Sequence, residues 1–206
     1  MKHILIILSL FLFSLTIISC AKKSSSSSSD TTTQMGGSIQ GVELSLSTVV
    51  TTLAGTGSSG SVNGTGTSAS FYNPQGITTD GTNLYVAERV NHLIRKIFIS
   101  TGAVTTVAGT GSSGSANGTG TSASFNNPVG ITTDGTNLYV ADYGNHLIRK
   151  IVISTGAVTT VAGTGSSGSA NGTGTSASFS NPIRITTDGT NLYVADDNTH
   201  LIRKIE

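Results

Sequence analysis

One unit recurs three times along this chain, at a spacing of 54 residues. Periods of this length are typical of supersecondary units that stack or form a ring, because one unit alone cannot bury its apolar face. The repeat therefore favours a binding scaffold over an enzyme with one unique pocket. Identical side chains mark the period at three positions of the unit: Asp80, Asp134 and Asp188; Pro74, Pro128 and Pro182; Arg95, Arg149 and Arg203.

Charged residues make up 10% of the chain, against about 25% in ordinary soluble proteins. Glycine, serine and threonine take their place, which favours β structure with many turns over helices. The formal net charge is +1, so the chain lacks the basic surface that nucleic acid or an acidic membrane attracts. We expect no nucleic-acid partner.

The first residues have the features of an export signal. Lys2 and His3 precede an apolar stretch, residues 4–18, that is shorter than the roughly 20 residues a membrane-spanning helix needs. The stretch ends in Ile-Ile-Ser-Cys, which resembles the lipobox of bacterial lipoproteins, and Cys20 is the only cysteine. The resemblance implies cleavage before Cys20 and lipidation of its thiol, so residues 1–19 are predicted to be a lipoprotein signal peptide. An ordinary secretory signal with an incidental cysteine is the alternative.

Residues 20–44 follow as a serine- and threonine-rich segment with six consecutive serines. Such a composition cannot bury apolar area, so we expect a disordered tether behind the lipidated Cys20. Ala21 at the second mature position favours the outer membrane under the sorting rule of enteric bacteria. The expected location is therefore the bacterial cell envelope, with the chain held at the membrane by its lipid.

The middle repeat reads as four short strands joined by tight turns. Strand-forming residues alternate with Asp-Gly-Thr-Asn, Asp-Tyr-Gly-Asn and Ser-Thr-Gly connections, as in an antiparallel meander. Four such strands are the content of one blade of a β-propeller. The fold class is therefore all-β, and the folded domain spans 45–206 with repeats at about 48–101, 102–155 and 156–206. The expected strands are 130–133, 138–141, 146–153 and 157–162.

The repeats resemble NHL repeats, which are named after their Asn-His-Leu tripeptide. Asn91-His92-Leu93 and Asn145-His146-Leu147 each follow a Tyr-Val-Ala strand, and the third repeat departs with Thr199-His200-Leu201. The resemblance covers about residues 48–206. It implies a β-propeller, usually of six blades, that serves chiefly as a platform for protein and in some cases RNA binding.

The expected strands add up to three blades. Residues 48–54 match the fourth strand of a unit, two full units follow, and the third unit contributes three strands up to Ile205. Rings usually have 4–8 blades, so three blades cannot close alone. Either two chains form a homodimer that completes a six-blade ring, or the array is a truncated remnant with exposed edges.

Three patterns resemble sites for small ligands. Gly55 to Gly60 matches the dinucleotide motif GxGxxG, but residues 61–73 lack the helix whose N-terminus would hold the pyrophosphate. His92, His146 and His200 could converge on zinc, as a related propeller lyase binds metal near its axis, yet each belongs to the repeat signature and is expected to bond backbone. The Asp-Gly-Thr-Asn segments lack the later ligands of a calcium loop. We expect neither metal nor cofactor.

The repeated arginines and the segments that differ between repeats are both expected at the surface. The arginines Arg95, Arg149 and Arg203, each followed by lysine, are interpreted as a solvated strand edge. The repeats differ mainly in the connection between the second and third strands and around residues 75–76, 129–130 and 183–184. Loops on one face of a propeller commonly carry recognition. The expected contact residues are Arg89, Tyr143, Arg184 and Asp197.

These features predict a membrane-anchored, non-enzymatic binding lipoprotein whose ligand is a protein or a glycan. A metal-dependent propeller lyase or hydrolase is the alternative from another class, and a non-functional repeat remnant is a third. An enzyme needs one asymmetric constellation of catalytic groups, and the sequence singles out none.

Overall fold

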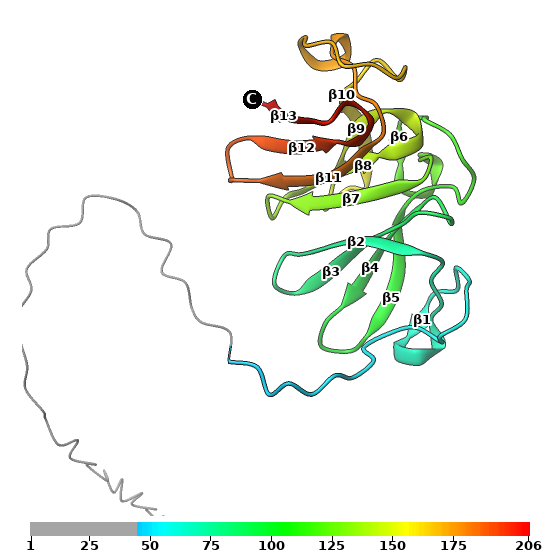
Figure 1. Cartoon of the computed structure of the whole chain (residues 1–206). Coiled ribbons are helices and arrows are strands. Elements are labelled where there is room, and N and C mark those ends of the chain that lie inside the picture. Colours follow the sequence, from blue (N-terminus) through cyan, green and yellow to red (C-terminus); the bar gives the residue numbers. More distant parts are fainter. Residues whose placement is uncertain (1–44) are drawn as a thin grey trace, which may run out of the picture. The chain divides into compact units, whose positions relative to one another are not determined.

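The computed structural model describes residues 45–206, so the expected signal peptide 1–19, the lipidation site Cys20 and the expected tether 20–44 lie outside the described residues. The described strands form three antiparallel sheets that follow one another along the chain (Figure 1). We call these sheets blades 1, 2 and 3. The prediction of an all-β protein built from four-stranded blades is confirmed.

Blades 1 and 2 share one topology, in which four strands form a meander and a two-residue strand from the preceding connection joins the outer edge. Blade 3 contains three strands among the described residues. The strands of blade 1 are β1 (Gly64–Thr65), β2 (Pro74–Thr79), β3 (Asn83–Glu88), β4 (Leu93–Phe98) and β5 (Ala103–Ala108). Those of blade 2 are β6 (Gly118–Thr119), β7 (Pro128–Thr133), β8 (Asn137–Asp142), β9 (Leu147–Val152) and β10 (Ala157–Ala162). Those of blade 3 are β11 (Pro182–Thr187), β12 (Leu192–Asp196) and β13 (Leu201–Ile205).

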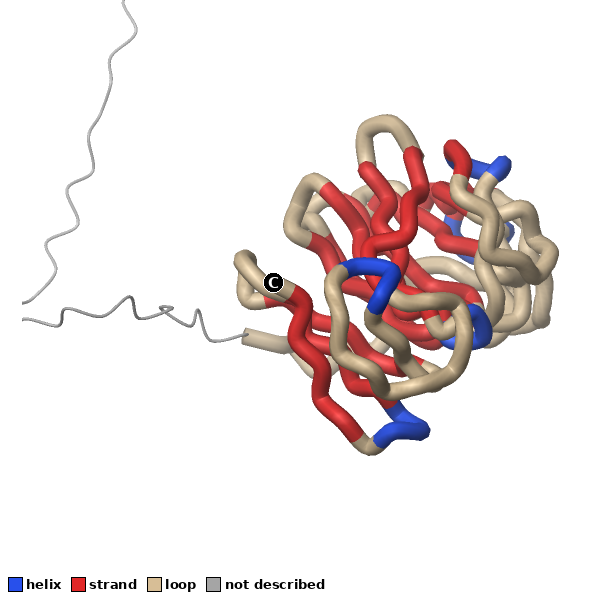
Figure 2. The backbone as a smooth tube through the Cα atoms, turned by 90° about the horizontal axis from the view of Figure 1, so that it is seen from above, coloured by secondary structure: helices blue, strands red, loops and turns tan. Residues whose placement is uncertain are grey.

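The helices among residues 45–206 are all single 3-10 turns of three residues (Figure 2). None of these described helices is long or apolar enough to cross a membrane. The turns are η1 (Gly66–Ser68), η2 (Gly120–Ser122), η3 (Tyr143–Asn145), η4 (Gly174–Ser176) and η5 (Asp197–Thr199).

The Asp-Gly-Thr-Asn segments are hairpin turns, as the sequence predicts. In blade 2, Asp134 Oδ1 accepts the backbone N–H groups of Thr136 and Asn137 at 2.8 and 2.6 Å. Its Oδ2 accepts the Tyr139 hydroxyl at 2.9 Å. Burial raises the pKa of Asp134, but the hydrogen bonds, above all those from Asn137, outweigh this effect and bring the pKa down to about 2. The carboxylate is therefore ionised and fully occupied in holding the turn.

The blades stack through apolar faces, because alternate residues of a strand point to opposite sides of a sheet. Between blades 1 and 2, Ile94 and Ala108 of blade 1 pack on Phe125, Ile131 and other residues of blade 2. The equivalent core between blades 2 and 3 contains Ile148, Ala162, Phe179, Ile185 and their neighbours. The inner strands β2, β7 and β11 lie side by side in this order (Figure 1). Blade 2 thus presents one face to blade 1 and the other to blade 3.

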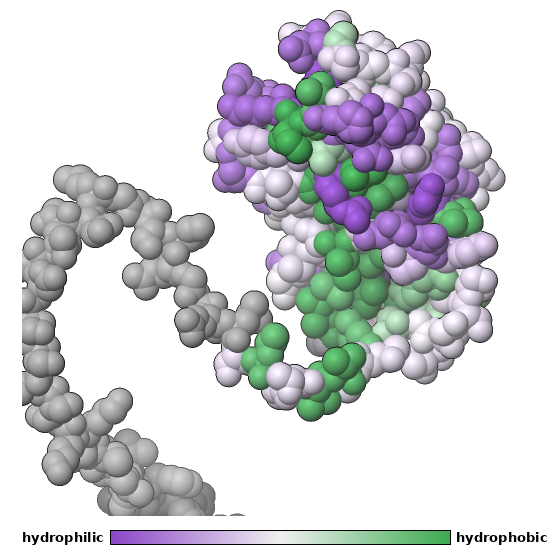
Figure 3. All heavy atoms as spheres, viewed as in Figure 1, coloured by the Kyte–Doolittle hydropathy of each residue, from purple (hydrophilic) through white to green (hydrophobic). Residues whose placement is uncertain are grey.

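The expected strand at residues 48–54 is not formed. These residues have no strand assignment, and the Val50 side chain is 95% exposed. A strand exists only when a neighbour accepts and donates its backbone hydrogen bonds, and no described strand lies beside this segment. Figure 3 shows hydrophobic surface over this segment and over the adjoining blade 1.

The arginine of each third strand is buried, so the interpretation of Arg95, Arg149 and Arg203 as a solvated edge is wrong. Arg149 Nη1 forms an ion pair with Asp142 Oδ2 at 2.9 Å, and both side chains are inaccessible to solvent. The same Nη1 donates to the Ser124 carbonyl at 3.1 Å. Nη2 donates to the Ala116 carbonyl and to Asn117 Oδ1 at 3.1 and 2.9 Å.

The partners of this arginine explain why the glycine-rich connections are ordered. Ala116, Asn117 and Ser124 all belong to the connection between blades 1 and 2, and the guanidinium also lies 5.2 Å from the centre of the Phe125 ring. One side chain therefore holds three points of a 19-residue segment, 109–127, whose own side chains bury little. Arg95 and Arg203 make the equivalent bonds in blades 1 and 3.

We expect the Arg149→Met substitution to lower the free energy of unfolding by about 3–5 kcal/mol, because it leaves Asp142 buried without its charge partner. Lys150→Met is the matched control, since Lys150 is only half-buried and forms no ion pair among the described residues. It should change stability by less than about 0.5 kcal/mol. Urea denaturation of the three proteins measures both values. Equal losses for the two variants would contradict the role given to Arg149.

Candidate binding face

The connections that differ between repeats lie at one edge of the blades. The pairing registers place Pro74 opposite Glu88, Pro128 opposite Asp142 and Pro182 opposite Asp196. The start of each inner strand therefore lies beside the end of the second strand and the connection that follows it. We call this edge, with its connections 89–92, 143–146 and 197–200, the variable face.

Two of the four expected contact residues meet on this face. The Arg89 guanidinium of blade 1 lies over the Tyr143 ring of blade 2, 5.4 Å from the ring centre. A guanidinium at this distance is attracted by the electrons of the ring face. Both residues are partly exposed, so the pair bridges two blades and still offers polar and aromatic atoms to solvent.

The other two expected contact residues lie on blade 3. Arg184 is an exposed residue of β11, and its Nη1 donates to the neighbouring Ile183 carbonyl at 3.2 Å. Asp197 is exposed at the start of η5, and its backbone N–H donates to the Asn181 carbonyl at 3.4 Å. Neither side chain forms an ion pair with a described residue. The charges of Arg184 and Asp197 therefore face solvent.

The histidines link neighbouring blades. His92 Nδ1 of blade 1 accepts the backbone N–H of Asn127 in blade 2 at 3.0 Å, and His146 Nδ1 accepts that of Asn181 in blade 3 at 3.1 Å. Burial lowers the pKa of His92, which favours the neutral ring that can accept this bond. The sequence-based expectation that these ring nitrogens bond backbone holds for both residues.

Within residues 45–206, no group of three or more His, Cys, Asp and Glu side chains has an arrangement that could hold a metal ion. The loop at Gly55–Gly60 folds back instead of starting a helix: the Gly60 N–H donates to the Phe71 carbonyl at 3.1 Å. The next helical residues form η1, a single turn that begins at Gly66. The loop therefore lacks the helix N-terminus that a dinucleotide pyrophosphate needs.

The sequence analysis did not identify two partners of the buried arginine. The acidic residue that ends each second strand, Asp142 in blade 2, is the buried partner of the arginine. The asparagine of each Asn-Gly-Thr sequence, Asn117 in blade 2, accepts from the same arginine through its side-chain oxygen. Both recur with the 54-residue period of the arginine, and this shared period was the available signal.

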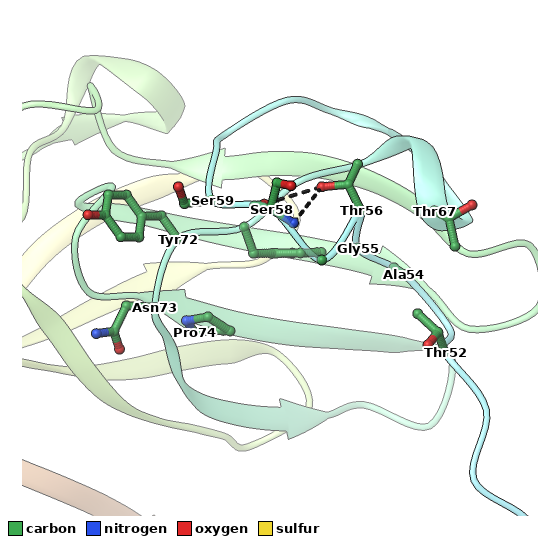
Figure 4. Close-up of a pocket in the computed structure, with 12 residues that line it drawn as sticks. Thr52, Ala54, Gly55, Thr56, Ser58, Ser59, Thr67, Tyr72, Asn73 and Pro74 are labelled. Carbon is green, nitrogen blue, oxygen red and sulfur yellow. Dashed lines mark hydrogen bonds between the residues drawn. The ribbon is translucent and has the colours of Figure 1, made fainter.

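A hollow of about 640 Å³ opens beside the start of β2 in blade 1. Figure 4 shows its lining, which comes from the segment around Ala54 and Gly55 on one side and from Tyr72, Asn73 and Pro74 on the other. Thr56 bridges the Ser58 backbone within this lining, with its hydroxyl bonded to both the N–H and the carbonyl at 3.2 Å. The lining is uncharged, so the hollow offers shape and backbone groups and no acid–base chemistry.

Comparison with known proteins agrees with this architecture. A family model described as NHL repeat matches residues 125–151. NHL repeat-containing protein 2 of Homo sapiens is 37% identical over 107 residues, which are 50% of this chain and 15% of that protein. The chain thus spans a small part of the curated relatives it matches.

Solved structures with the same fold come from Bacteroides. An auxiliary nutrient binding protein from Bacteroides ovatus superposes with a TM-score of 0.53 at 28% identity, over 61% of this chain and 35% of that one. A second auxiliary nutrient binding protein, from Bacteroides thetaiotaomicron, gives a TM-score of 0.59 at 23% identity, over 67% of this chain and 38% of that one; at this identity the likeness concerns the fold. Taken with the His-Leu signature and the blades, the matches identify NHL repeats in this chain.

Proposed function

We propose that this protein is a lipid-anchored, non-enzymatic binding scaffold of the bacterial cell envelope. One observation carries the proposal: the polar groups that recur with the repeat are used up inside the fold. Asp134 holds a turn, Asp142 and Arg149 hold a connection, and His146 joins two blades. The connections that differ between the repeats lie on the variable face.

The variable face has the chemistry of a recognition surface. It combines an aromatic ring and a guanidinium at the Arg89–Tyr143 pair with the free charges of Arg184 and Asp197. Tyrosine and arginine are the side chains that most often dominate binding energies at interfaces. Their mixture with amides suits a polar ligand, a glycan or a protein segment. The likeness to the nutrient binding protein from Bacteroides ovatus supports a role in binding.

The sequence around Cys20 supports the lipid anchor. Cys20 stands after an apolar segment and before a serine-rich one, an arrangement that would hold the blades away from the membrane on a tether. A scaffold held in this way meets ligands in the envelope instead of diffusing out of it. The Bacteroides structures of the same fold are consistent with a bacterial envelope protein.

Binding at the variable face is tested with the chain from residue 20 onward, carrying Cys20→Ser, on arrays of oligosaccharides and of synthetic peptides. We expect ligands whose affinity falls at least about tenfold on Tyr143→Ala or Arg184→Ala, because such residues anchor interfaces. Thr136→Ala is the control, since Thr136 is exposed in the β7–β8 hairpin at the other end of the blade. Absence of any ligand on both arrays, or an equal loss for the control, would refute the proposed face.

Lipidation at Cys20 is tested by metabolic labelling of the full chain with a palmitate analogue in a bacterial host. The parent chain and the Ser19→Ala variant should be labelled, because a small residue still precedes the thiol. Cys20→Ser should lose the label and move to the soluble fraction, since the chain has no other cysteine to accept the lipid. A Cys20→Ser chain that labels as strongly as the parent would rule the anchor out.

A further inference from the structure

The seam between blades 1 and 2 carries a charge on the variable face that no described residue neutralises. Both blades that form this seam are present in the structure, so its surface is complete. The Arg89 guanidinium lies here, partly exposed, and forms no ion pair with a described residue. Glu88, the residue before it, is fully buried and pairs with Arg95 at 3.0 Å. The charge of Arg89 is therefore available to a ligand.

The ionisable groups beside Arg89 leave this charge unopposed. On the blade 2 side, Asp142 is fully buried and forms its ion pair with Arg149. On the blade 1 side, His92 Nδ1 accepts a backbone N–H from blade 2, and burial lowers the pKa of this histidine, which favours the neutral ring. Among the described residues, the seam thus has one free charge on the variable face, and this charge is positive.

The Tyr143 ring holds the guanidinium of Arg89 in place. The guanidinium carbon lies over the ring, 5.4 Å from its centre. A cation–π contact uses the charge of the guanidinium and leaves its N–H donors free for hydrogen bonds. These donors form a rigid fork that matches the two oxygens of a carboxylate. The pair therefore has the geometry of a bidentate acceptor site for one carboxylate group.

The backbones that carry this pair are also fixed. The Arg89 N–H donates to the Asn73 carbonyl at 3.1 Å. After Tyr143, the Gly144 N–H donates to the Asn126 carbonyl at 2.8 Å. A Cβ at Gly144 would lie only 2.7 Å from Asn126 Cγ, so the connection packs closely on the segment before β7. A ligand at the pair would have little protein backbone to order, which favours binding.

The surroundings of the pair fit a sugar better than a peptide. The variable face consists of turns and strand ends, so it offers no free sheet edge to which an extended peptide could add. Its exposed large apolar side chain at this seam is Val90, which is 38% exposed and stands alone there among the described residues. A sugar instead uses an aromatic surface and polar partners, which Tyr143 and the half-buried amides of Asn126 and Asn127 supply.

We propose that the Arg89–Tyr143 pair is an acidic-sugar subsite, which binds the carboxylate of a uronic acid in an oligosaccharide lying over the seam between blades 1 and 2. This inference rests on the proposed function, because it names the ligand class of the variable face. Arg89 donates to the carboxylate, and Tyr143 positions Arg89 and contacts the sugar ring. One acidic group is enough, since the formal net charge of +1 offers no wider basic surface to a polyanion.

The seam between blades 2 and 3 lacks this subsite. At the repeat position of Arg89, blade 2 has Tyr143, so the described part of the chain offers the arginine–tyrosine pair at one seam. We therefore expect one acidic sugar to bind per chain.

Paired glycan arrays test the subsite. The chain from residue 20 onward with Cys20→Ser, which contains the compact unit Thr48–Glu206, is applied to oligosaccharides that contain one uronic acid, each printed as the free acid and as its neutral methyl ester. We expect free acids that bind at least about tenfold more tightly than their esters, because a hydrogen bond to a charged group is stronger than one to a neutral group. This preference should shrink in high salt, which screens exposed charges.

Variants of the pair separate the two roles. Arg89→Gln should remove the preference for the free acid and change the affinity for the ester by less than about twofold. Tyr143→Phe keeps the ring and should keep the preference, whereas Tyr143→Ala should reduce it together with the affinity. Lys150→Gln is the matched control, because it removes the same charge from a half-buried position within β9. It should bind as the parent does, and circular dichroism checks that each variant folds.

The outcomes distinguish the subsite from the binding face. Equal binding of acids and esters, or a preference that survives Arg89→Gln, would overturn the subsite. In that case, neutral glycans that lose affinity on Tyr143→Ala would still support the proposed face. Acidic peptides that bind where no glycan does would also overturn the subsite and would place a protein at the seam. Absence of any ligand on glycan and peptide arrays would refute both the face and the subsite.

Discussion

The buried arginine of each third strand holds the rest of this structure in place. A connection of glycine, serine, threonine and asparagine has too little apolar area to order itself. Arg149 supplies the missing anchor, because its guanidinium binds Asp142, the carbonyls of Ala116 and Ser124, and the Asn117 side chain. Burial of the Asp142 carboxylate is tolerated because Arg149 balances its charge and its oxygens also accept hydrogen bonds from the Asn126 N–H and Asn145 Nδ2. The chain therefore has small, well-packed blades although few of its residues are large and apolar.

This anchoring divides the molecule into a fixed frame and a variable face. The frame uses the repeated polar residues, so substitution there breaks a bond that every blade needs. The variable face is free of that constraint: one repeat position there is Arg89, Tyr143 or Asp197, and another is Gly76, Gly130 or Arg184. A repeated frame can carry different contacts on each blade without loss of stability. Recognition by such a protein changes through loop residues alone.

The strands, the hairpin turns and the backbone role of the histidines could be predicted from the sequence, because each depends on residues close together in the chain. Asp-Gly-Thr-Asn makes the same turn wherever two strands flank it. The burial of Arg149 could not be predicted in this way, since its partners Ala116 and Asn117 lie 33 and 32 residues away. For residues 48–54 the prediction from the sequence fails for a different reason. Their sequence specifies a strand, yet a strand needs a neighbour, and the neighbour in the described residues is missing.

Hydrogen–deuterium exchange of the connection 109–127 tests the central role of the arginine most directly. Gly114, Gly120 and Ser124 donate backbone N–H groups to Phe125, Gly156 and Ala116 within the region that Arg149 holds. If the arginine orders the connection, these amides exchange slowly in the native protein and become fast when Arg149 is replaced, while amides in β2–β4 keep their protection. Fast exchange of the connection in the native protein, or unchanged protection after the replacement, would contradict the account.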